Sequence, residues 1–588
     1  MNNSIGSLSL IMVTLALFLA GRVSAINLVK NGAFESLEGW TTSDPALAVL
    51  STEAVEGKTC LKLTSAPGAA DGTDSTAIYR MIDIKSFKPD GEYRMQFKAR
   101  SDHFPQEYIV FLGLMQGQQL PVAIGNEWRQ VGTNWQDVSI DFRDVNPIAT
   151  GVKLIIQVRA KGSVCIDDLR IEQLPKGTIG AEDLQLKDLP KYKGSRDFVQ
   201  ITPARRFLVK GKPFFPIGMW GLDFPNEKAM EDMHKYGFNM TGSGHLFSRK
   251  AEGTKAYLDT AHAHGLMVIG VMRFAISGET EKALAEAETY KPVFKPIVEI
   301  TKNHPAFFAY DIGDEVAWAG NSKSALASGS HFFRENDPNH PVFSNQAPRQ
   351  SISLFKRWYR FVDIGGSDIY PYWNGEPDRH SDLPNKTIAV VGDECKKNLT
   401  ALGPGKPVLM TIQAFGWSDG NADPETKAKA YGYPPVTEQR FMVYDAIASG
   451  ASGIMLYQDM RYNDASGSII DPRVKTVSLE LSAMHDILAA ATAAKGAISL
   501  DKRVKLITKT FNNELYIIAV NTTDKNIQAK IKLPVISKAW SVLFESKNIV
   551  TKTAVITDSY EPWDVNIYTN STNKSFLHEL ENNAKTMR

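Results

Sequence analysis

The chain has 588 residues, 43% of them hydrophobic, and its 66 Lys and Arg nearly balance its 65 Asp and Glu. The apolar fraction is sufficient for packed cores, which excludes a disordered chain. The balanced charge argues against nucleic acid or an anionic membrane surface as the partner, since both require a basic face. Three cysteines cannot form a disulfide scaffold; Cys60 and Cys165 either form one bridge or stay as buried free thiols.

The N-terminal segment predicts export. Residues 8–20 form an apolar run, and small residues up to Ala25 follow it, so we expect a signal peptide over residues 1–25. The run is too short to remain as a membrane span, and no later stretch reaches about 18 apolar residues. We therefore expect a secreted, periplasmic or cell-surface protein that begins near Ile26 and has no membrane association after cleavage.

Two patterns of apolar residues follow in chain order. Residues 26–175 carry short alternating runs between Gly, Asp and Pro, which is typical of an antiparallel β-sandwich. The charged segment 176–198 predicts a linker. Over residues 199–496, short apolar strands alternate with helical stretches. The eight strand candidates are residues 214–220, 238–241, 266–271, 307–312, 341–344, 361–365, 407–412 and 453–457.

Eight strand–helix units in about 300 residues favour a (β/α)8 TIM barrel. A doubly wound sheet is the alternative, but the sequence lacks both a G-x-G-x-x-G motif after a strand and a phosphate-binding loop. Residues 497–572 return to strand patterns and predict a small C-terminal β-sandwich, while residues 573–588 predict a flexible tail. The predicted fold class is thus multidomain, with a β-sandwich, a TIM barrel and a second β-sandwich.

The candidate site follows from the barrel, because such barrels place their active sites at the C-terminal ends of the strands. The adjacent Asp314 and Glu315 follow the fourth predicted strand, where crowding raises the pKa of at least one carboxyl, as a general acid requires. A solvated acidic loop or a helix N-cap is the alternative interpretation.

Polar and aromatic residues follow the other predicted strands. Aromatic faces can stack on sugar rings while amides and carboxylates bind hydroxyls, although each such residue could equally serve packing. The candidate substrate-binding residues are Trp220, His245, Arg273, Asn345, Asp368, Tyr370, Gln413, Trp417, Tyr457 and Gln458. The sequence has neither an H-E-x-x-H motif nor a G-x-S-x-G elbow, so we expect no catalytic cofactor and no serine nucleophile.

The segment 304–315, HPAFFAYDIGDE, resembles the strand-four segment of the clan A glycoside hydrolases. That clan places an acid/base Glu after strand four and a nucleophile Glu after strand seven. The resemblance implies that Glu315 is the acid/base, with Asp314 where an Asn usually stands. Segments 406–417 and 450–457 resemble strands seven and eight, but Gln413 occupies the nucleophile position. The resemblance covers about 300 residues and implies a polysaccharide or oligosaccharide substrate.

A neutral amide cannot attack an anomeric carbon, so the Gln413 departure leaves three hypotheses. In the first, Asp314 orients a substrate acetamido group that attacks intramolecularly, which resembles the Asp–Glu pair of substrate-assisted hexosaminidases. In the second, another carboxylate, such as Asp368 or Asp223, acts as base or nucleophile. In the third, the barrel has lost catalysis and only binds glycan.

The N-terminal domain resembles the jelly-roll carbohydrate-binding modules. Its opening segment is NLVKNGAFE at 27–35, and its closing segment is VCIDDL at 164–169. In such modules an early Glu and a late Asp often hold a structural calcium, so the resemblance implies this role for Glu35 with Asp168 or Asp167. Turn and capping roles are the alternative for these acids. The C-terminal sandwich resembles those that follow many such barrels.

Overall fold

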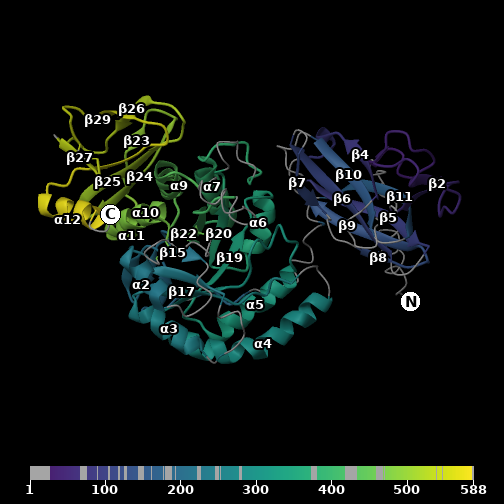
Figure 1. Ribbon diagram of the computed structural model, residues 1–588, viewed down its shortest axis with the longest axis horizontal. Helices are drawn as coiled ribbons and strands as arrows, with labels where there is room; N and C mark the ends of the chain where they lie inside the picture. The colour runs from purple at the N-terminus through teal and green to yellow at the C-terminus, as the bar shows by residue number, and fades with distance from the viewer. Residues whose placement is uncertain are drawn as a thin grey trace, which may run out of the picture. The chain divides into compact units, whose positions relative to one another are not determined.

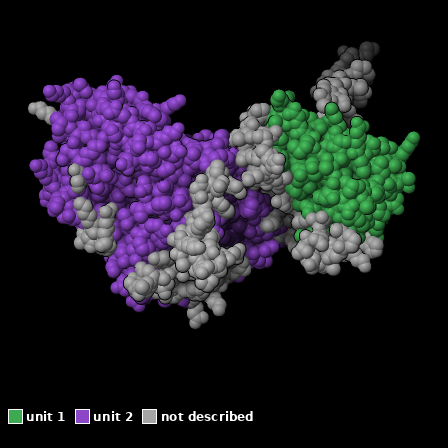
Figure 2. Space-filling model, turned by 45° about the horizontal axis from the view of Figure 1, so that its top comes forward, with its two compact units in different colours: residues 1–185 green, residues 186–588 purple. Residues whose placement is uncertain are grey.

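The protein is described by a computed structural model in which the chain forms two compact units, Met1–Gln185 and Leu186–Arg588 (Figure 2). The predicted signal peptide and most of the predicted linker lie outside the described residues. The described residues are 27–65, 76–88, 91–102, 106–116, 119–124, 129–143, 151–159, 162–175, 178, 189–192, 194–220, 227–244, 251, 253–276, 281–372, 380–417, 433–458, 468, 470–537, 539–545 and 547–585.

The first unit consists of two antiparallel sheets. One has the order β1-β4-β10-β6-β7 with β8 on β6, and the other has the order β2-β3-β11-β5-β9. The strands of the first sheet are β1 (Thr41–Thr42), β4 (Thr76–Ile82), β6 (Gln106–Gln116), β7 (Gln119–Ile124), β8 (Arg129–Val131) and β10 (Gly151–Arg159). Those of the second are β2 (Ala48–Ser51), β3 (Cys60–Thr64), β5 (Glu92–Ser101), β9 (Gln136–Arg143) and β11 (Ser163–Leu174).

Alternation along these strands builds the core of the first unit. In β10, Val152, Leu154, Ile156 and Val158 point into one core with Leu61 and Leu63 of β3 and Ile166 of β11. The residues between them face outward, as period two requires. A short 3-10 helix, η2 (Ile84–Ser86), follows β4.

The second unit contains a closed barrel of eight parallel strands, in chain order around the barrel (Figure 1). Its strands are β15 (Ile217–Trp220), β16 (Met240–Ser243), β17 (Met267–Val271), β18 (Phe307–Asp311), β19 (Val342–Gln346), β20 (Ile364–Ile369), β21 (Val408–Gln413) and β22 (Gly453–Tyr457). The barrel expected from the eight apolar runs is therefore confirmed. Most strand residues are buried, including polar ones in β16, β19 and β20, because both faces of the strands are covered.

Helices surround this barrel, and a small sheet closes its amino end. The helices are α2 (Glu227–Lys235), α3 (Thr254–Ala263), α4 (Glu281–Thr301), α5 (Lys323–Asn336), α6 (Ile352–Tyr359), α7 (Val390–Leu402), α9 (Val436–Ala448), α10 (Pro472–Ala483) and α11 (His485–Ala489). The small sheet comprises β12 (Val199–Ile201), β13 (Phe207–Val209) and β14 (Lys212–Phe214). Its Val199 and Phe207 pack against Ile269, Phe308 and other inward-facing barrel residues. No helix in the described part of the chain has the length and apolar character needed to cross a membrane.

The C-terminal domain has two antiparallel sheets, as its strand patterns predict, of orders β23-β26-β29 and β24-β25-β30-β27-β28. Its strands are β23 (Ile498–Ser499), β24 (Val504–Phe511), β25 (Glu514–Asn521), β26 (Ile527–Lys532), β27 (Ala539–Leu543), β28 (Lys547–Val550), β29 (Val555–Tyr560) and β30 (Val565–Thr569). We expected residues 573–588 to form a flexible tail. In the structure, residues Lys574–Lys585 instead form helix α12. Its apolar residues Phe576, Leu577 and Leu580 join the barrel core, which holds the helix against α10.

Candidate active site

The turn after β18 carries the two adjacent carboxylates. The Gly313 amide donates to Asp311 Oδ1 at 3.1 Å, and the Gly313 carbonyl accepts from the Asn345 amide at 3.0 Å, which fastens this turn to β19. Glu315 then adopts a left-handed backbone conformation with φ of 48°. This conformation is strained for a residue with a side chain. The surrounding hydrogen bonds therefore hold Glu315 in a position that the local sequence alone does not favour.

Asn345 and Arg273 tie the acids of neighbouring strands together. Asn345 Nδ2 donates to Asp314 Oδ1 at 3.1 Å and to Asp368 Oδ1 at 2.8 Å, which bridges the ends of β18 and β20. Arg273, from the end of β17, lies 3.1 Å from Asp314 Oδ2 and 3.7 Å from Asp311 Oδ2. Parallel strands bring these side chains together because their carboxyl ends meet at one rim.

Glu315 and Asp368 form the centre of this group, since each of these two carboxyls perturbs the ionisation of the other. Burial, and then the charge of Asp314, raises the pKa of Glu315. Burial, and then the charge of Glu315, raises the pKa of Asp368 well above its usual range. Two buried carboxyls close together resist ionising at the same time, so the second ionisation of the pair is shifted to higher pH.

An aromatic cluster adjoins the carboxyls. The Tyr370 ring stacks on Tyr457 at 5.7 Å and on His380 at 4.8 Å, and it meets Trp417 edge-on at 6.2 Å. Burial, and then the charge of Asp368, raises the pKa of the Tyr370 hydroxyl, which therefore stays protonated. Tyr457 is 43% exposed, so this cluster presents an aromatic face to solvent beside the acids.

Three other predicted residues use their polar atoms within the fold. The Trp220 indole N–H donates to Thr411 Oγ1 at 2.9 Å inside the barrel. The Gln413 side chain is fully buried; its Oε1 accepts from the Tyr372 amide at 2.8 Å, and its Nε2 donates to the Tyr372 carbonyl at 2.9 Å. Gln458 Oε1 accepts from the Asp471 amide at 3.0 Å. His245 and Asp223 lie outside the described residues.

The structure adds site residues that sequence reasoning did not assign. Asp311 is fully buried at the end of β18, and burial raises its pKa to about 6 against the opposing charge of Arg273. His380 accepts from the Tyr370 amide at Nδ1, 3.1 Å away, and burial lowers its pKa to about 3. Trp318, three residues after Glu315, is 51% exposed. For Trp318 the signal was present: it is an aromatic residue in the loop that follows the acid pair.

In the first unit, Glu35 lies in the loop before β1, and Asp168 lies within β11 at the irregularity between Asp167 and Arg170. Glu35 Oε1 accepts from the Lys58 amide at 2.6 Å, and Asp168 lies 3.6 Å from Arg170. Burial raises the pKa of Asp168 against the charge of Arg170, with Glu56 and Asp167 adding to the rise. Calcium prefers six to eight oxygen ligands, so backbone carbonyls would have to supply most of them here.

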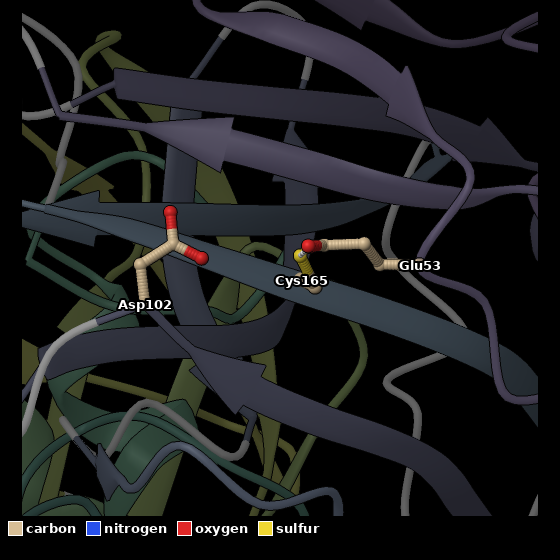
Figure 3. A group of neighbouring side chains, drawn as sticks. All are labelled: Glu53, Asp102 and Cys165. Carbon is tan, nitrogen blue, oxygen red and sulfur yellow. Dashed lines mark hydrogen bonds between the residues drawn. The ribbon is translucent and has the colours of Figure 1, made fainter.

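One group of three potential metal ligands lies elsewhere in the described part of the first unit (Figure 3). Glu53, Asp102 and Cys165 place their ligand atoms within 4.8 Å of one another. Arg100 already pairs with Glu53, and Lys62 lies 2.9 Å from Asp102. Each carboxylate therefore has a cationic partner without any metal. All three cysteines of the chain are buried free thiols.

Comparison with known proteins finds no matching family model and no matching curated protein. Among solved structures, a glycoside hydrolase is 13% identical with a TM-score of 0.47, over 65% of this chain and 98% of that one. A family 5 glycoside hydrolase from Bacteroides vulgatus is 14% identical with a TM-score of 0.46, over 66% and 96%. TmCBM61, solved with β-1,4-galactotriose, is 16% identical with a TM-score of 0.20, over 26% and 100%. Similarity at this level leaves the function to be argued from the site.

Proposed function

We propose that this chain is an exported glycoside hydrolase in which Glu315 is the general acid and Asp314 its electrostatic partner. The observation that carries the proposal is the group of Asp314, Glu315 and Asp368 at the carboxyl rim of the barrel, in which Asn345 bridges the two aspartates and the pKa of both Glu315 and Asp368 is raised. A carboxylic acid that stays protonated at neutral pH can donate its proton to the leaving glycosidic oxygen.

The attacking group is constrained by the same geometry. Acid and nucleophile carboxyls of a retaining glycosidase stand about 5 Å apart, and those of an inverting enzyme about 6.5–9.5 Å apart. The charge of Glu315 raises the pKa of Asp368, so we assign these two carboxyls to one proton-holding pair rather than to an acid and a nucleophile on two sides of a sugar. Attack then comes from a water molecule or from a substrate acetamido group. Asp314, which Arg273 and Asn345 hold in place, would orient either one.

Substrate recognition is assigned to the aromatic cluster around Tyr370. Tyr457 and Trp417 present ring faces beside the acids, and such faces suit the C–H surfaces of pyranose rings. Gln413 fixes the backbone at Tyr372 and therefore serves as a positioning residue for this cluster. Trp220 packs inside the barrel below this cluster, where its ring stacks on Phe343 with ring centroids 6.1 Å apart.

The first unit is proposed to be a jelly-roll glycan-binding module. In register across three neighbouring strands, Tyr79, Ile155 and Phe111 form a row. The alternate residues Ile78, Ile156 and Val110 belong to the core, so this row lies on the outer face of the six-stranded sheet. Lys153 lies over the Tyr79 ring at 3.5 Å. An aromatic row beside a cation suits a sugar chain, and Tyr79→Ala should weaken polysaccharide binding without changing hydrolysis of a small aryl glycoside.

The test of the hydrolase proposal is Glu315→Gln in the secreted protein, assayed on a panel of polysaccharides and aryl glycosides. We expect a rate at least ~10²-fold lower, with glycan affinity largely unchanged. A substrate-assisted enzyme would require a 2-acetamido sugar and be inhibited by a thiazoline mimic. N-terminal sequencing of the exported protein checks the proposed cleavage after Ala25.

A non-catalytic glycan-binding role is the second candidate, and one observation favours it. The strand-seven position carries Gln413, whose amide is committed to backbone hydrogen bonds rather than aimed at a ligand. A binder would show glycan affinity in an array but no turnover on any substrate of the panel, and Glu315→Gln would then change nothing in the hydrolysis assay.

A further inference from the structure

Three cationic side chains converge at the amino end of the barrel, which is the end opposite to the carboxylates of the candidate active site. Arg205 and Arg206 lie in the turn between β12 and β13, and Lys509 lies on β24 of the C-terminal domain. All three line one cavity of about 140 Å³, together with the segments that come just before β15 and β22. The cavity thus lies where the small closing sheet, the barrel and the C-terminal domain meet within the second unit.

The partners of these cations are backbone carbonyls. Lys509 Nζ donates to the Ala490 carbonyl at 3.2 Å, and Arg206 Nη1 donates to the Ala489 carbonyl at 3.4 Å. Arg205 Nη2 donates to the Gly403 carbonyl at 3.2 Å. The Nε atoms of both arginines are buried without a hydrogen-bond acceptor among the described residues.

The cavity lacks a compensating negative charge. None of the described residues that line it is acidic. Lys509 is only 7% exposed, and burial, followed by the charge of Arg206, lowers its pKa to about 8. Lys509 is therefore still charged at neutral pH. Buried charges in proteins are normally paired, so an unpaired lysine beside two arginines indicates a missing anion.

We propose that this cavity binds a small oxyanion, namely sulfate, phosphate or a carboxylate group, between Arg205, Arg206 and Lys509. A water molecule occupies about 30 Å³ of liquid volume, so the space admits such an ion. The guanidinium groups of the two arginines and the remaining N–H donors of Lys509 supply the charge-assisted hydrogen bonds that an oxyanion accepts.

A second cavity adjoins the proposed ion site, and a bound ion would connect two parts of the second unit. Arg206 and Phe214 also line a neighbouring cavity of about 750 Å³, whose other charged or titratable residues are Lys212, His485 and Asp486. Asp486 is paired with His485, whose Nδ1 lies 2.9 Å away. An ion held by both Arg206 and Lys509 would join the closing sheet of the barrel to the C-terminal domain.

Thermal unfolding of the full mature chain tests this proposal. The melting temperature is followed as sodium chloride is replaced, at constant ionic strength, by sodium sulfate, phosphate or acetate. We compare the wild type with Lys509→Met and with Lys532→Met, which removes an exposed lysine from the same domain. The general stabilising effect of sulfate is common to all three proteins, so the specific effect is the difference between them.

We expect a saturable rise in the melting temperature of the wild type and of Lys532→Met. In Lys509→Met the concentration needed should rise at least ~10-fold, because a charge-assisted hydrogen bond is lost. A larger response to acetate would identify a carboxylate ligand, and a larger response to sulfate or phosphate would identify a dianion. Equal responses of the wild type and Lys509→Met, or no response beyond chloride, would overturn the proposal. If Lys509→Met does not fold, Arg206→Gln is judged by the same criterion.

Discussion

The two ends of the barrel carry opposite excesses of buried charge. At the carboxyl end, Asp311, Asp314, Glu315 and Asp368 converge, and Arg273 pairs with Asp311 and Asp314. At the amino end, Arg205, Arg206 and Lys509 line one cavity without any acid among its described lining residues. The same eight strands thus separate a proton-holding site from a site that lacks its anion.

Elsewhere in the second unit, buried charged side chains form ion pairs in which positive and negative charges balance. Lys505 lies 2.5 Å from Asp445, and Arg440 lies 2.9 Å from Glu480. These pairs join packed elements and leave no charge uncompensated, which is the usual condition of buried ions. An excess of buried charge of one sign, in contrast, is neutralised by a change in protonation or by a bound ion of opposite charge. Substitutions that remove the charged residues at either end of the barrel should therefore change activity or stability.

The largest effect is expected from Asp368→Asn at the carboxyl end. Without its proton-sharing partner, Glu315 should lose about 10³-fold in kcat/KM, equivalent to about 4 kcal/mol of transition-state stabilisation. The alkaline limb of the kcat/KM profile should move to lower pH, because the pair no longer has to lose its last proton against the charge of a second carboxylate.

The control for this variant is Asp363→Asn, which removes a buried acid just before the other end of β20. Asp363 is paired with Arg334 at 2.9 Å, so its loss should lower stability without moving the pH profile of the folded enzyme. Wild-type kcat/KM in Asp368→Asn would show that the Glu315–Asp368 pair has no part in the reaction.

At the amino end, Lys509→Met should stabilise the anion-free protein. Its pKa is lowered from 10.5 to about 8 in the folded state, which corresponds to a destabilisation of about 3 kcal/mol when the group is charged. This penalty is fully present below pH 8 and disappears as pH rises towards 10.5, because the unfolded state binds more protons in that window. Urea unfolding in chloride buffer should therefore show a more stable variant at pH 7 and a smaller difference at pH 10. A variant no more stable than the wild type at pH 7 would show that Lys509 is already compensated.

A smaller effect is expected from Gln413→Glu, which installs the carboxylate that strand seven of the resembling enzymes carries. The Nε2 donor that now serves the carbonyls of Tyr372 and Phe415 would be lost, and those oxygens would face a negative charge. We expect the free energy of unfolding to fall by about 2 kcal/mol, with no gain in activity. The exposed Gln528→Glu serves as the control in the same denaturation experiment. A stable and more active Gln413→Glu would assign the nucleophile position to strand seven after all.

The sequence predicted the barrel well because buried parallel strands read as continuous apolar runs. It joined β14 and β15 into one strand, since the apolar run from Phe214 continues through Pro216 although the chain leaves one sheet there for another. It treated α12 as a tail, because four apolar residues in a polar segment form a helix face only when α10 is there to receive them. Both errors concern packing partners that are distant in the chain.

For the candidate active site, the sequence predicted which residues lie at the carboxyl rim of the barrel. Asn345 and Asp368 lie at the carboxyl ends of their strands, and Arg273, Asp314, Glu315 and Tyr370 follow theirs; the barrel brings all six together. The direction of a side chain was not predictable: Gln413 stands in the same position relative to its strand but turns to the backbone of Tyr372. The cationic cavity was not predictable either. Arg205 and Lys509 are 304 positions apart in the chain and meet only through the contact between two domains.

Asp314→Asn gives the smallest expected change and the sharpest distinction between mechanisms. The charge of Asp314 raises the pKa of both Glu315 and Asp368. If Asp314 acts only through this charge, its removal moves the alkaline limb of kcat/KM to lower pH, leaving activity near wild type at pH 5 and about tenfold lower above neutrality. If Asp314 instead orients a substrate acetamido group, kcat falls at every pH and only for 2-acetamido sugars. An unchanged profile on all substrates would remove Asp314 from the site and leave Asp368 as the one acid that sets the proton affinity of Glu315.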